Sequence, residues 1–503
     1  MPLELPQIQL GGISPEIALC VTALLLLVVD AFIGGHVEGR NRGVFLPLMS
    51  TVGLVVAIVL AWNLWGGVAE DGPELQMAGM VTVDGFSIFV KITLAVFGLL
   101  TIWLGREYLT RENLEEPEFY ALVLFAVAGM MLMASATDLI LIFIALETFS
   151  LALYVLVGFR RKSLISQESA MKYFLLGAFS SAFFLLGIAL TYGATGSTNL
   201  YGAPGSGTEV GISQFLSTNP SGDAAFLVLA VAFLIIGLSF KIAAVPFHMW
   251  TPDAYQGAPS PVTGFMAAGS KLAAFAALLR LLDVSLFQLR GDWRPIVIAL
   301  SVLSMVAGAV FAVVQEDLKR LLAYSSIAHA GYILIGVVAA NDRGISGTLF
   351  YLSTYGITVI GAFALVSMLS GPGERFSRLV DFKGLFYRRP LLAGALSLFL
   401  LSLAGVPLTS GFVGKLVVFG AAIEEGYAPL VVVGAISSAI AAFFYLRVMV
   451  VMYMQEADET TPHAEVGVAA GTVVGLAAAA TLVLGLAWSP LYELAQKATL
   501  FFG

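Results

Sequence analysis

Seven basic side chains lie within or at the ends of long apolar stretches of this 503-residue chain. A lysine at the centre of a bilayer costs about 2.5–3.5 kcal/mol on the insertion scale, so each needs a physical reason. They are Lys91, Lys172, Lys241, Lys271, Arg280, Lys415 and Arg447. One carboxyl, Glu147, lies in a similar stretch, LIFIALETFSLALYVL. Lysine and glutamate side chains inside a membrane are typical of proton or ion paths.

Glu147 and Lys172 stand on either side of the basic loop Arg160–Lys162. At 1.5 Å per residue, both are expected about 15–20 Å below the membrane surface. Because the helices on the two sides of a loop run antiparallel, we expect these side chains to pair. The pair could be a structural clamp between two helices or part of a proton path, and both interpretations stay open.

Lys271 lies near the middle of its apolar stretch, PVTGFMAAGSKLAAFAALLR. The small residues around it allow a neighbouring helix to approach closely. A proton-path role is favoured over the alternative, a lysine that binds a carbonyl oxygen freed from its helix.

Two long stretches carry helix-breaking residues beside a lysine. In 223–250, Pro246 should end the helix just after Lys241, because proline removes a backbone hydrogen bond. In 391–421, the helix should unwind near 405–411 and resume before Lys415. The residues that predict this second break are Gly405, Pro407 and Gly411. Broken helices at membrane depth line cavities and mark ion sites in transporters, whereas the alternative is a proline kink with a snorkelling lysine.

Two histidines extend this set of proton-transfer candidates. His248 follows the first break, in PFHMWTPD, and His329 lies in AYSSIAHAGYILIG. Histidine titrates near neutrality and can relay protons, although a single buried histidine is more often a packing residue. The remaining charges carry less weight, since Lys91 and Arg447 could snorkel and Arg280 could reach the interface.

The elements that must position these residues are membrane-spanning helices. Charged residues make up 12% of the chain, against about 25% in soluble domains, and 59% of residues are hydrophobic. Hydropathy predicts fourteen spans of about the length that a bilayer requires. They are 14–33, 44–65, 84–105, 118–135, 138–159, 167–193, 223–250, 261–283, 295–314, 321–340, 346–370, 391–421, 428–453 and 466–489. The sequence therefore predicts an all-α polytopic membrane protein.

The basic residues predict the orientation of these spans. The odd-numbered loops carry most of the basic residues outside the spans, whereas the even-numbered loops and the C-terminal tail hold only Arg290, Arg294, Arg343 and Lys497. By the positive-inside rule, the odd loops are cytoplasmic and both termini lie on the outer side. A nucleic-acid partner is not expected, because the chain has no basic domain.

The order of features repeats along the chain. Residues 118–283 and 295–453 each hold five predicted helices, the fourth of which is broken beside a lysine. Because five is odd, the second unit crosses the membrane in the opposite sense, which makes an inverted repeat with sites near the midplane. Residues 1–117 and 466–503 supply helices 1–3 and helix 14.

The chain resembles the antiporter-like membrane subunits of respiratory complex I, the NADH–quinone oxidoreductase. The resemblance rests on VPFHMWTPDAYQGAPSPVTGFMAAGSK at 245–271 and GVPLTSGFVGKLVVF at 405–419, and it covers essentially the whole chain. Within that family both motifs are most similar to the subunit N branch. Subunit M would carry a glutamate at the position of Lys415, and subunit L would extend into a long lateral helix.

The resemblance implies a role for each candidate residue. It makes Glu147 the partner of the broken-helix lysine Lys241, Lys271 the central lysine and Lys415 the lysine on the exit side. It also places Lys172, His248 and, by a weaker match, His329 on the same polar axis. Proton transfer would follow when movement of Glu147 changes how strongly Lys241 holds its proton.

The resemblance also implies partners and location. The chain itself is expected to hold no cofactor or metal, while FMN, iron–sulfur clusters and quinone are expected in other subunits. Subunit M and small membrane subunits such as K are the expected neighbours, in the inner (plasma) membrane of a bacterium. Two alternatives remain open: a subunit of an Mrp-type sodium/proton antiporter, and a passive scaffold of the membrane arm.

Overall fold

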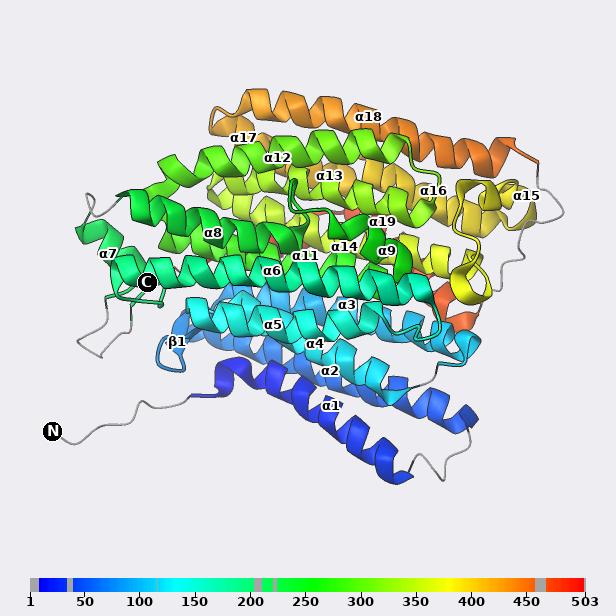
Figure 1. Cartoon of the computed structure of the whole chain (residues 1–503), viewed down its shortest axis with the longest axis horizontal. Helices are drawn as coiled ribbons and strands as arrows, with labels where there is room; N and C mark the ends of the chain where they lie inside the picture. The colour runs from blue at the N-terminus through cyan, green and yellow to red at the C-terminus, as the bar shows by residue number, and fades with distance from the viewer. Residues whose placement is uncertain are drawn as a thin grey trace.

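The computed structural model describes residues 9–33, 39–114, 116–202, 210–219, 224–456 and 467–501. Long helices run side by side, most of them along one common direction (Figure 1). They are α1 (Ser14–Ile33), α2 (Gly39–Asp71), α3 (Gly85–Glu112), α4 (Pro117–Ser135), α5 (Leu139–Val157), α6 (Leu164–Thr195), α8 (Ala224–Ile242), α12 (Arg290–Val313), α13 (Leu318–Ala339), α14 (Asp342–Leu369), α16 (Pro390–Ala404), α17 (Ser410–Glu424), α18 (Ala428–Met454) and α19 (Val468–Leu486).

Shorter elements connect or extend these helices. They are η1 (Gly11–Ile13), the hairpin of β1 (Glu74–Gln76) and β2 (Val81–Val83), α7 (Ile212–Thr218), α9 (Trp250–Gly257), α10 (Ser260–Phe265), η2 (Met266–Ser270), α11 (Lys271–Leu279), η3 (Arg280–Ser285), η4 (Phe287–Leu289), η5 (Pro372–Glu374), η6 (Leu379–Phe382), α15 (Leu385–Arg388) and α20 (Ser489–Lys497). The strands pair antiparallel, with Leu75 opposite Thr82. The helix predicted at 261–283 is not regular, because η2 and η3 are π-helical turns on either side of α11.

The structure confirms an all-α polytopic membrane protein. In the described ranges, twelve helices are long and apolar enough to cross a membrane, and two shorter apolar helices coincide with α8 and α16. These two lie where the sequence predicts broken spans. The exact count of fourteen spans, the inverted repeats and the unit boundaries stay predictions.

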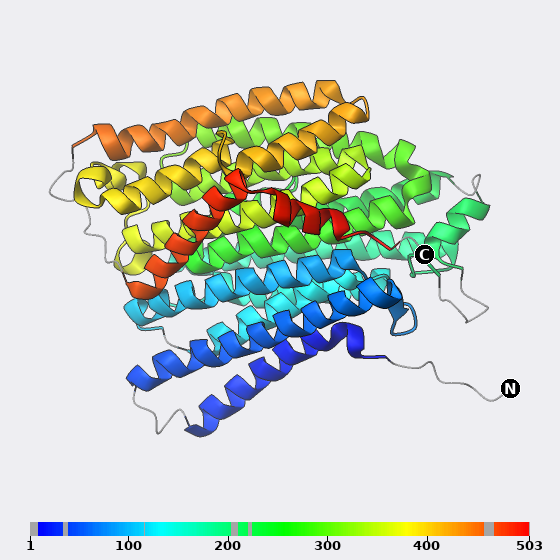
Figure 2. The same ribbon diagram turned by 180° about the vertical axis from the view of Figure 1, so that it is seen from behind.

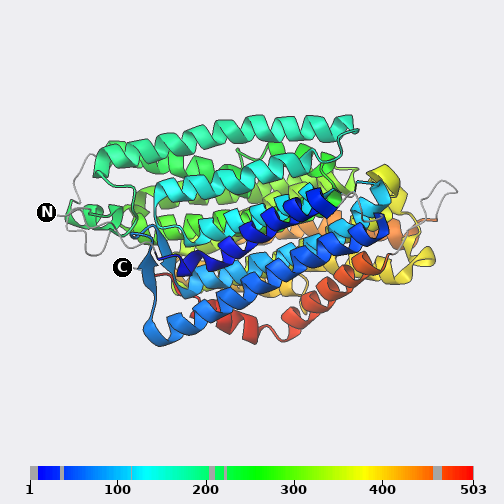
Figure 3. The ribbon, with the colours of Figure 1, turned by 90° about the horizontal axis from the view of Figure 1, so that it is seen from below.

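Burial separates central helices from peripheral ones. The segment from α10 to η3, together with α13 and α14, is almost fully enclosed by protein, whereas only 33% of the residues in the most apolar stretch of α1, of α6 and of α18 are buried. Figures 2 and 3 show α19 crossing the back of the bundle obliquely, on the face that α1 and α2 also help to form. Exposed apolar side chains on peripheral helices are suited to lipid.

Three charged residues that the sequence analysis expected to reach the interface are instead bound inside the protein. Arg280 is fully buried and forms a two-pronged ion pair with Asp84, at 2.9 and 3.1 Å. Lys91 Nζ lies 2.8 Å from a Glu16 carboxylate oxygen, and the Arg447 guanidinium donates to the carbonyl of Val313. Arg280 and Lys91 lie near a span end, but the segments next to the β1–β2 hairpin cover that end with Asp84 and Glu16, whereas Arg447 binds the other end of the bundle, at the end of α12.

Arg280 ties the central helix to the surface elements around it. Its guanidinium also donates to the Ala134 carbonyl and the Tyr201 hydroxyl, while the Phe501 amide donates to Asp84. Burial raises the pKa of the Asp84 carboxyl, but the Arg280 charge and hydrogen bonds outweigh it and hold the pKa below its ordinary value. Asp84 is therefore a carboxylate at neutral pH.

The first prediction concerns Arg280→Gln. Removing one member of a buried pair leaves the Asp84 carboxylate without a countercharge, so we expect a loss of about 3–5 kcal/mol of stability. Thermal unfolding of the detergent-solubilised protein measures it. The matched control is Arg378→Gln, because the exposed Arg378–Glu316 pair should contribute less than about 1 kcal/mol. Equal melting temperatures for the two variants would contradict the prediction.

Candidate functional site

Lys241 occupies an aromatic cage at the end of α8. Its side chain is buried, and Nζ lies 3.3 Å from the Tyr154 hydroxyl. Four ring centroids surround Nζ at 5.2–5.7 Å. The rings belong to Phe149, Tyr154, Tyr173 and Phe240. Ring faces attract a cation, by about 2 kcal/mol or more where water is excluded, so the cage favours the ammonium form against its burial.

The chain unwinds directly after Lys241. α8 ends at Ile242, and Ala243 takes a left-handed φ of 61°. The break is held by its own contacts: the Val245 amide donates to Ser304 Oγ at 2.8 Å, and Trp250 Nε1 donates to the Phe240 carbonyl at 3.0 Å. Backbone groups released by the break are therefore bound within the protein, as membrane depth requires.

His248 lies in the unwound segment that contains Pro246. It is half-buried, and its Nδ1 is enclosed without a hydrogen-bond partner in the described structure. Met249 beside it is 73% exposed, so this segment reaches the surface of the isolated chain.

The expected pairing of Glu147 with Lys172 is wrong. Glu147 accepts a hydrogen bond from Ser181 on α6, whereas Lys172 binds Asp253 at 2.9 Å and also pairs with Glu168. Helices α5 and α6 lie where the sequence predicts them, but their rotation about their own axes points the Glu147 and Lys172 side chains in different directions. The side chain of Lys172 is 46% exposed, which places it outside the buried group of candidates.

Lys271 meets a cluster of hydroxyl groups at the centre of the bundle. It follows the π-helical turn η2, and its Nζ donates to the carbonyl of Ser326 on α13. The Ser326 hydroxyl lies 2.8 Å from Tyr355 Oη and 3.3 Å from Tyr255 Oη. Lys271 thus binds a carbonyl in the interior of α13, within a hydrogen-bonded group that also contains tyrosine side chains.

His329 lies between Lys271 and Lys415. Its Nδ1 is 3.0 Å from the Tyr351 hydroxyl, and its Nε2 is 3.5 Å from the Tyr445 hydroxyl. Its ring is 4.9 Å from the Tyr355 ring and 5.6 Å from the Tyr332 ring, between centroids. Ser326, His329 and Tyr332 are three residues apart on α13, which places them on one helix face.

Lys415 binds backbone carbonyl groups at the second helix break. Its Nζ donates to the carbonyls of Leu403 and Ala404, at 3.1 and 2.9 Å, and to Ser438 Oγ at 2.8 Å. The Tyr332 ring centroid is 4.7 Å from the same nitrogen. α16 ends at Ala404 and α17 begins at Ser410, with Pro407 in between.

Two glycines make this break possible. Gly405 adopts a left-handed φ of 86°, which suits glycine. A Cβ atom at Gly411 would lie 2.0 Å from the Ser402 carbonyl oxygen, so another residue would separate the two half-helices. The sequence motif GVPLTSG therefore encodes both the turn and the close packing after it.

The tyrosines of this site are the residues that sequence reasoning missed. Buried tyrosines connect the lysines and the histidine, namely Tyr154, Tyr173, Tyr255, Tyr332, Tyr351, Tyr355 and Tyr445. A signal was present, since tyrosine usually lies at membrane interfaces and several of these fall near span centres. Which of them face one another depends on helix rotation.

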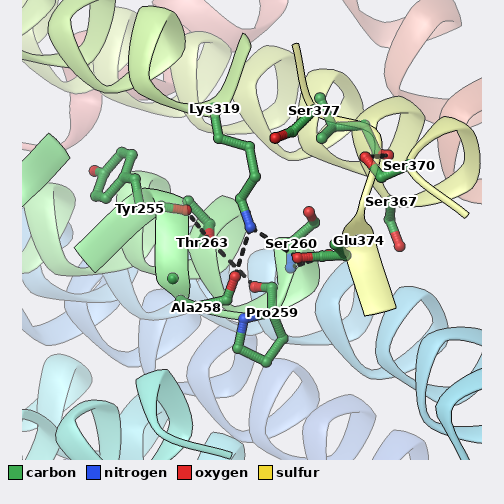
Figure 4. Close-up of polar contacts among 12 residues, drawn as sticks. Tyr255, Ala258, Pro259, Ser260, Thr263, Lys319, Ser367, Ser370, Glu374 and Ser377 are labelled. Atoms are coloured by element: carbon green, nitrogen blue, oxygen red, sulfur yellow. Dashed lines mark hydrogen bonds and ion pairs between the residues drawn. The ribbon is translucent and has the colours of Figure 1, made fainter. Parts of the chain in front are cut away.

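A second charged cluster closes one end of the bundle (Figure 4). Lys319 Nζ donates to a Glu374 carboxylate oxygen at 2.9 Å and to the Ala258 carbonyl, and Glu374 also accepts from the Ser260 amide at 2.8 Å. Arg160 lies 3.8 Å from the same carboxylate. These contacts clamp η5 against the turn between α9 and α10, next to Tyr255. Lys319 lies outside the predicted spans, between 295–314 and 321–340.

The second prediction concerns Glu374→Gln and pH. Burial raises the pKa of Glu374, but the charges of Lys319 and Arg160 prevail and hold it below its ordinary value of about 4.3. A lowered folded pKa means that the carboxylate stabilises the fold above about pH 4, and that this stabilisation disappears as pH falls through the folded pKa.

We therefore expect Glu374→Gln to lower the melting temperature at pH 7, through a loss of about 3–5 kcal/mol in the free energy of unfolding. Near pH 4 this loss should be smaller. The double variant Lys319→Met Glu374→Gln should recover part of the loss, because no charge is left unpaired. A difference between wild type and Glu374→Gln that grows on acidification would refute this account.

Comparison with known proteins bears on what such an arrangement does. Residues 136–441 match the family described as "NADH:quinone oxidoreductase/Mrp antiporter, TM". The chain is 44% identical to NADH-quinone oxidoreductase subunit N of Parafrankia sp., over 98% of this chain and 95% of that protein. It is 42% identical to the protein of the same name from Chloroflexus aggregans, over 100% and 99% of the two chains.

Solved structures with the same fold include two membrane complexes. A chain of respiratory complex I from Thermus thermophilus with bound aureothin matches with a TM-score of 0.80 and 35% identity, over 96% of this chain and 99% of that one. A chain of the Mrp complex from Dietzia sp. matches with a TM-score of 0.81, over 97% and 96%, but at 22% identity it shares the fold alone.

Proposed function

Because the chain belongs to the NADH-quinone oxidoreductase subunit N family, we propose that it carries protons through its buried polar axis while neighbouring subunits reduce quinone. The observation that carries the proposal is the series of enclosed titratable groups between the two helix breaks. Lys241, Lys271, His329 and Lys415 follow one another in it, separated by tyrosines and serines.

The contacts divide this axis into two parts: one linked by hydrogen bonds, and one linked only by contacts between aromatic rings. Between Lys271 and Lys415, hydroxyl groups and ring contacts link each titratable side chain to the next. Between Lys241 and Tyr255, the contacts run through aromatic rings. Tyr173 stacks on Trp250 with 4.5 Å between ring centroids, and Trp250 meets Tyr255 edge to face with 6.3 Å between centroids. Proton transfer across that aromatic part requires water molecules between the polar groups or a change of side-chain rotamers.

Glu147 supplies the electrostatic control. It is half-buried, and Lys241 has no carboxylate within ion-pair distance in the described structure. An approaching Glu147 carboxylate would stabilise the ammonium form of Lys241, and its departure would favour release of the proton. Opposite charges about 4 Å apart attract by several kcal/mol in a partly desolvated site, which is enough to change the protonation state.

Redox chemistry belongs to other subunits in this proposal. FMN, iron–sulfur clusters and quinone would be held outside this chain, and the described residues contain no group of three or more His, Cys, Asp or Glu side chains that could hold a metal ion.

The complex-I likeness supports partner subunits in a membrane arm, and we propose subunit M and a small subunit such as K as the neighbours.

Two observations weigh on the alternatives. The Mrp complex shares the fold, but the high identity over nearly the whole chain is to subunit N proteins, which favours the oxidoreductase over the sodium/proton antiporter. A passive scaffold would use Lys415 and Lys271 as they are found, each bound to backbone carbonyls. Lys241 departs from that pattern, since it binds a hydroxyl and ring faces, and it is therefore the residue to test.

The third prediction concerns Lys241→Ala and the neutral near-isostere Lys241→Met. Both remove the titratable group, so we expect coupled proton pumping and quinone reduction to fall about tenfold or more in assembled complex. Proton uptake and NADH oxidation in inverted membranes measure the two activities, and a native gel checks assembly. The matched control is Lys162→Ala, an exposed lysine in the Arg160–Lys162 loop.

The outcomes separate the two interpretations. Loss of both activities with intact assembly supports the proton path. Full activity of Lys241→Met would show that only the packing of this side chain matters and would favour a scaffold.

The fourth prediction concerns orientation in the bacterial inner membrane. We propose that the loops rich in basic residues are cytoplasmic and that both termini are periplasmic. In a Cys20→Ser background, Ser217→Cys and Arg378→Cys place single exposed thiols at opposite ends of the bundle. We expect a membrane-impermeant maleimide to label position 217, but not 378, in spheroplasts with the cytoplasmic membrane intact. Labelling of 378 alone would reverse the orientation.

A further inference from the structure

Three oxygen atoms converge on the ammonium group of Lys415 at the second helix break. Its Nζ donates to the carbonyls of Leu403 and Ala404, at 3.1 and 2.9 Å, and to Ser438 Oγ at 2.8 Å. An ammonium group has three N–H bonds, so each of them has an acceptor here. The Tyr332 ring, whose centroid is 4.7 Å from Nζ, adds an aromatic contact. We call these two carbonyls and the serine hydroxyl the oxygen cradle.

The oxygen cradle differs from the surroundings of the other two lysines of the proposed path. In the described structure, Lys271 Nζ donates to one carbonyl, and Lys241 Nζ has one hydroxyl and aromatic rings around it. Carbonyl oxygens at the unwound end of a half-helix are the ligands with which several transporters bind sodium. The carbonyl end of α16 also carries the negative pole of the helix dipole, which attracts a cation whether or not that cation is attached to the chain.

The turn leaves room for this cation and holds the oxygens in place. Lys415 belongs to α17 and reaches back to Ala404, eleven residues earlier on α16, whereas a lysine that caps its own helix lies in the last turn of that helix. A Cβ atom at Gly405 would lie 3.1 Å from Lys415 Nζ, so glycine keeps the space beside the nitrogen open. Ser438 Oγ also donates to the Ala404 carbonyl at 3.1 Å, which fixes two of the three oxygens relative to each other.

A cavity reaches the same turn from outside the polar axis. It has a volume of about 810 Å³ and is lined by Pro407 and Leu408 of the turn. Its lining also includes the polar residues Asp342, at the beginning of α14, and Gln496, on α20. Leu408 is 66% exposed in the isolated chain, and Ser438 is only partly buried. The oxygen cradle therefore lies beside an accessible turn, and without its lysine it would be open to small ions.

We propose that the oxygen cradle is a binding site for a monovalent cation, and that the Lys415 ammonium group occupies it as a tethered cation and so excludes sodium and potassium. All three oxygens are uncharged, whereas Ca²⁺ and Mg²⁺ bind sites that contain carboxylates. Lys415 is then the residue that keeps the axis selective for protons. This selectivity rests on the proposed function, since it matters only if the axis carries protons.

Thermal unfolding of the detergent-solubilised full chain tests the proposal. Sodium, potassium or ammonium chloride is added at constant ionic strength, with choline chloride as the comparison, because the bulky choline ion does not fit among the three oxygens. Lys415→Ala empties the oxygen cradle, and we expect each small cation to raise the melting temperature of this variant saturably, by about 2 °C or more. Adding Ser438→Ala removes one oxygen and should raise the half-saturating concentration about tenfold.

Wild type and Lys271→Ala are the controls. The lysine fills the oxygen cradle in the first, and only one carbonyl lines the emptied place in the second, so neither should distinguish sodium from choline. If Lys415→Ala does not fold, Lys415→Glu provides the same measurement, because a carboxylate beside these oxygens should bind the cation more tightly.

Two results would overturn the proposal: equal melting temperatures in sodium and choline for the Lys415 variants, or a sodium effect of the same size in wild type or Lys271→Ala. The measurement does not depend on proton pumping. A failure of the Lys241 test would therefore refute the proton path and leave the cation site standing, and the absence of a cation effect would refute the site alone.

Discussion

Charge buried away from water has to be partnered, and this requirement organises the whole molecule. Arg280 with Asp84 and Lys91 with Glu16 join the central helices to the segments that cover one end of the bundle. Lys319 with Glu374 does the same at the α9–α10 turn. Each pair is costly to desolvate, so it holds only where both members and their hydrogen bonds are in place. The apolar surfaces bring the helices together, and the ion pairs determine which segments lie against one another.

The lysines of the proposed path obey the same requirement in a weaker form. Lys271 and Lys415 bind carbonyl oxygens, and Lys241 binds a hydroxyl group and ring faces. None of the three has a carboxylate within ion-pair distance in the described part of the chain. A lysine held by neutral dipoles can lose its proton without leaving an unpaired charge in the protein. Arg280 cannot, because the guanidinium keeps its proton and the buried Asp84 carboxylate needs its positive charge. The difference in partner therefore separates groups that could carry protons from those that fix the fold.

The two broken helices show how backbone and charge act together. At the second break, Lys415 takes up carbonyls that the helix can no longer bond, so the lysine and the unwound turn stabilise each other. At the first, Ser304 and Trp250 bind the freed backbone groups, which leaves Lys241 available to the aromatic cage. Similar motifs in the sequence thus produce a bound lysine at one break and a less constrained one at the other.

The sequence by itself determined the membrane class, the apolar stretches, the two breaks and the lysines beside them, because length, hydropathy and proline act locally. Only the tertiary structure decided which side chains meet. It separated Lys172 from Glu147, buried Arg280 and Lys91, and brought tyrosines from six helices around His329 and the lysines. These contacts depend on how each helix is rotated about its axis and on how distant segments pack, and a single sequence records neither. Successive residues of a helix point about 100° apart, so a rotation of that size turns a different side chain toward a neighbouring helix, while the hydropathy along the sequence stays the same.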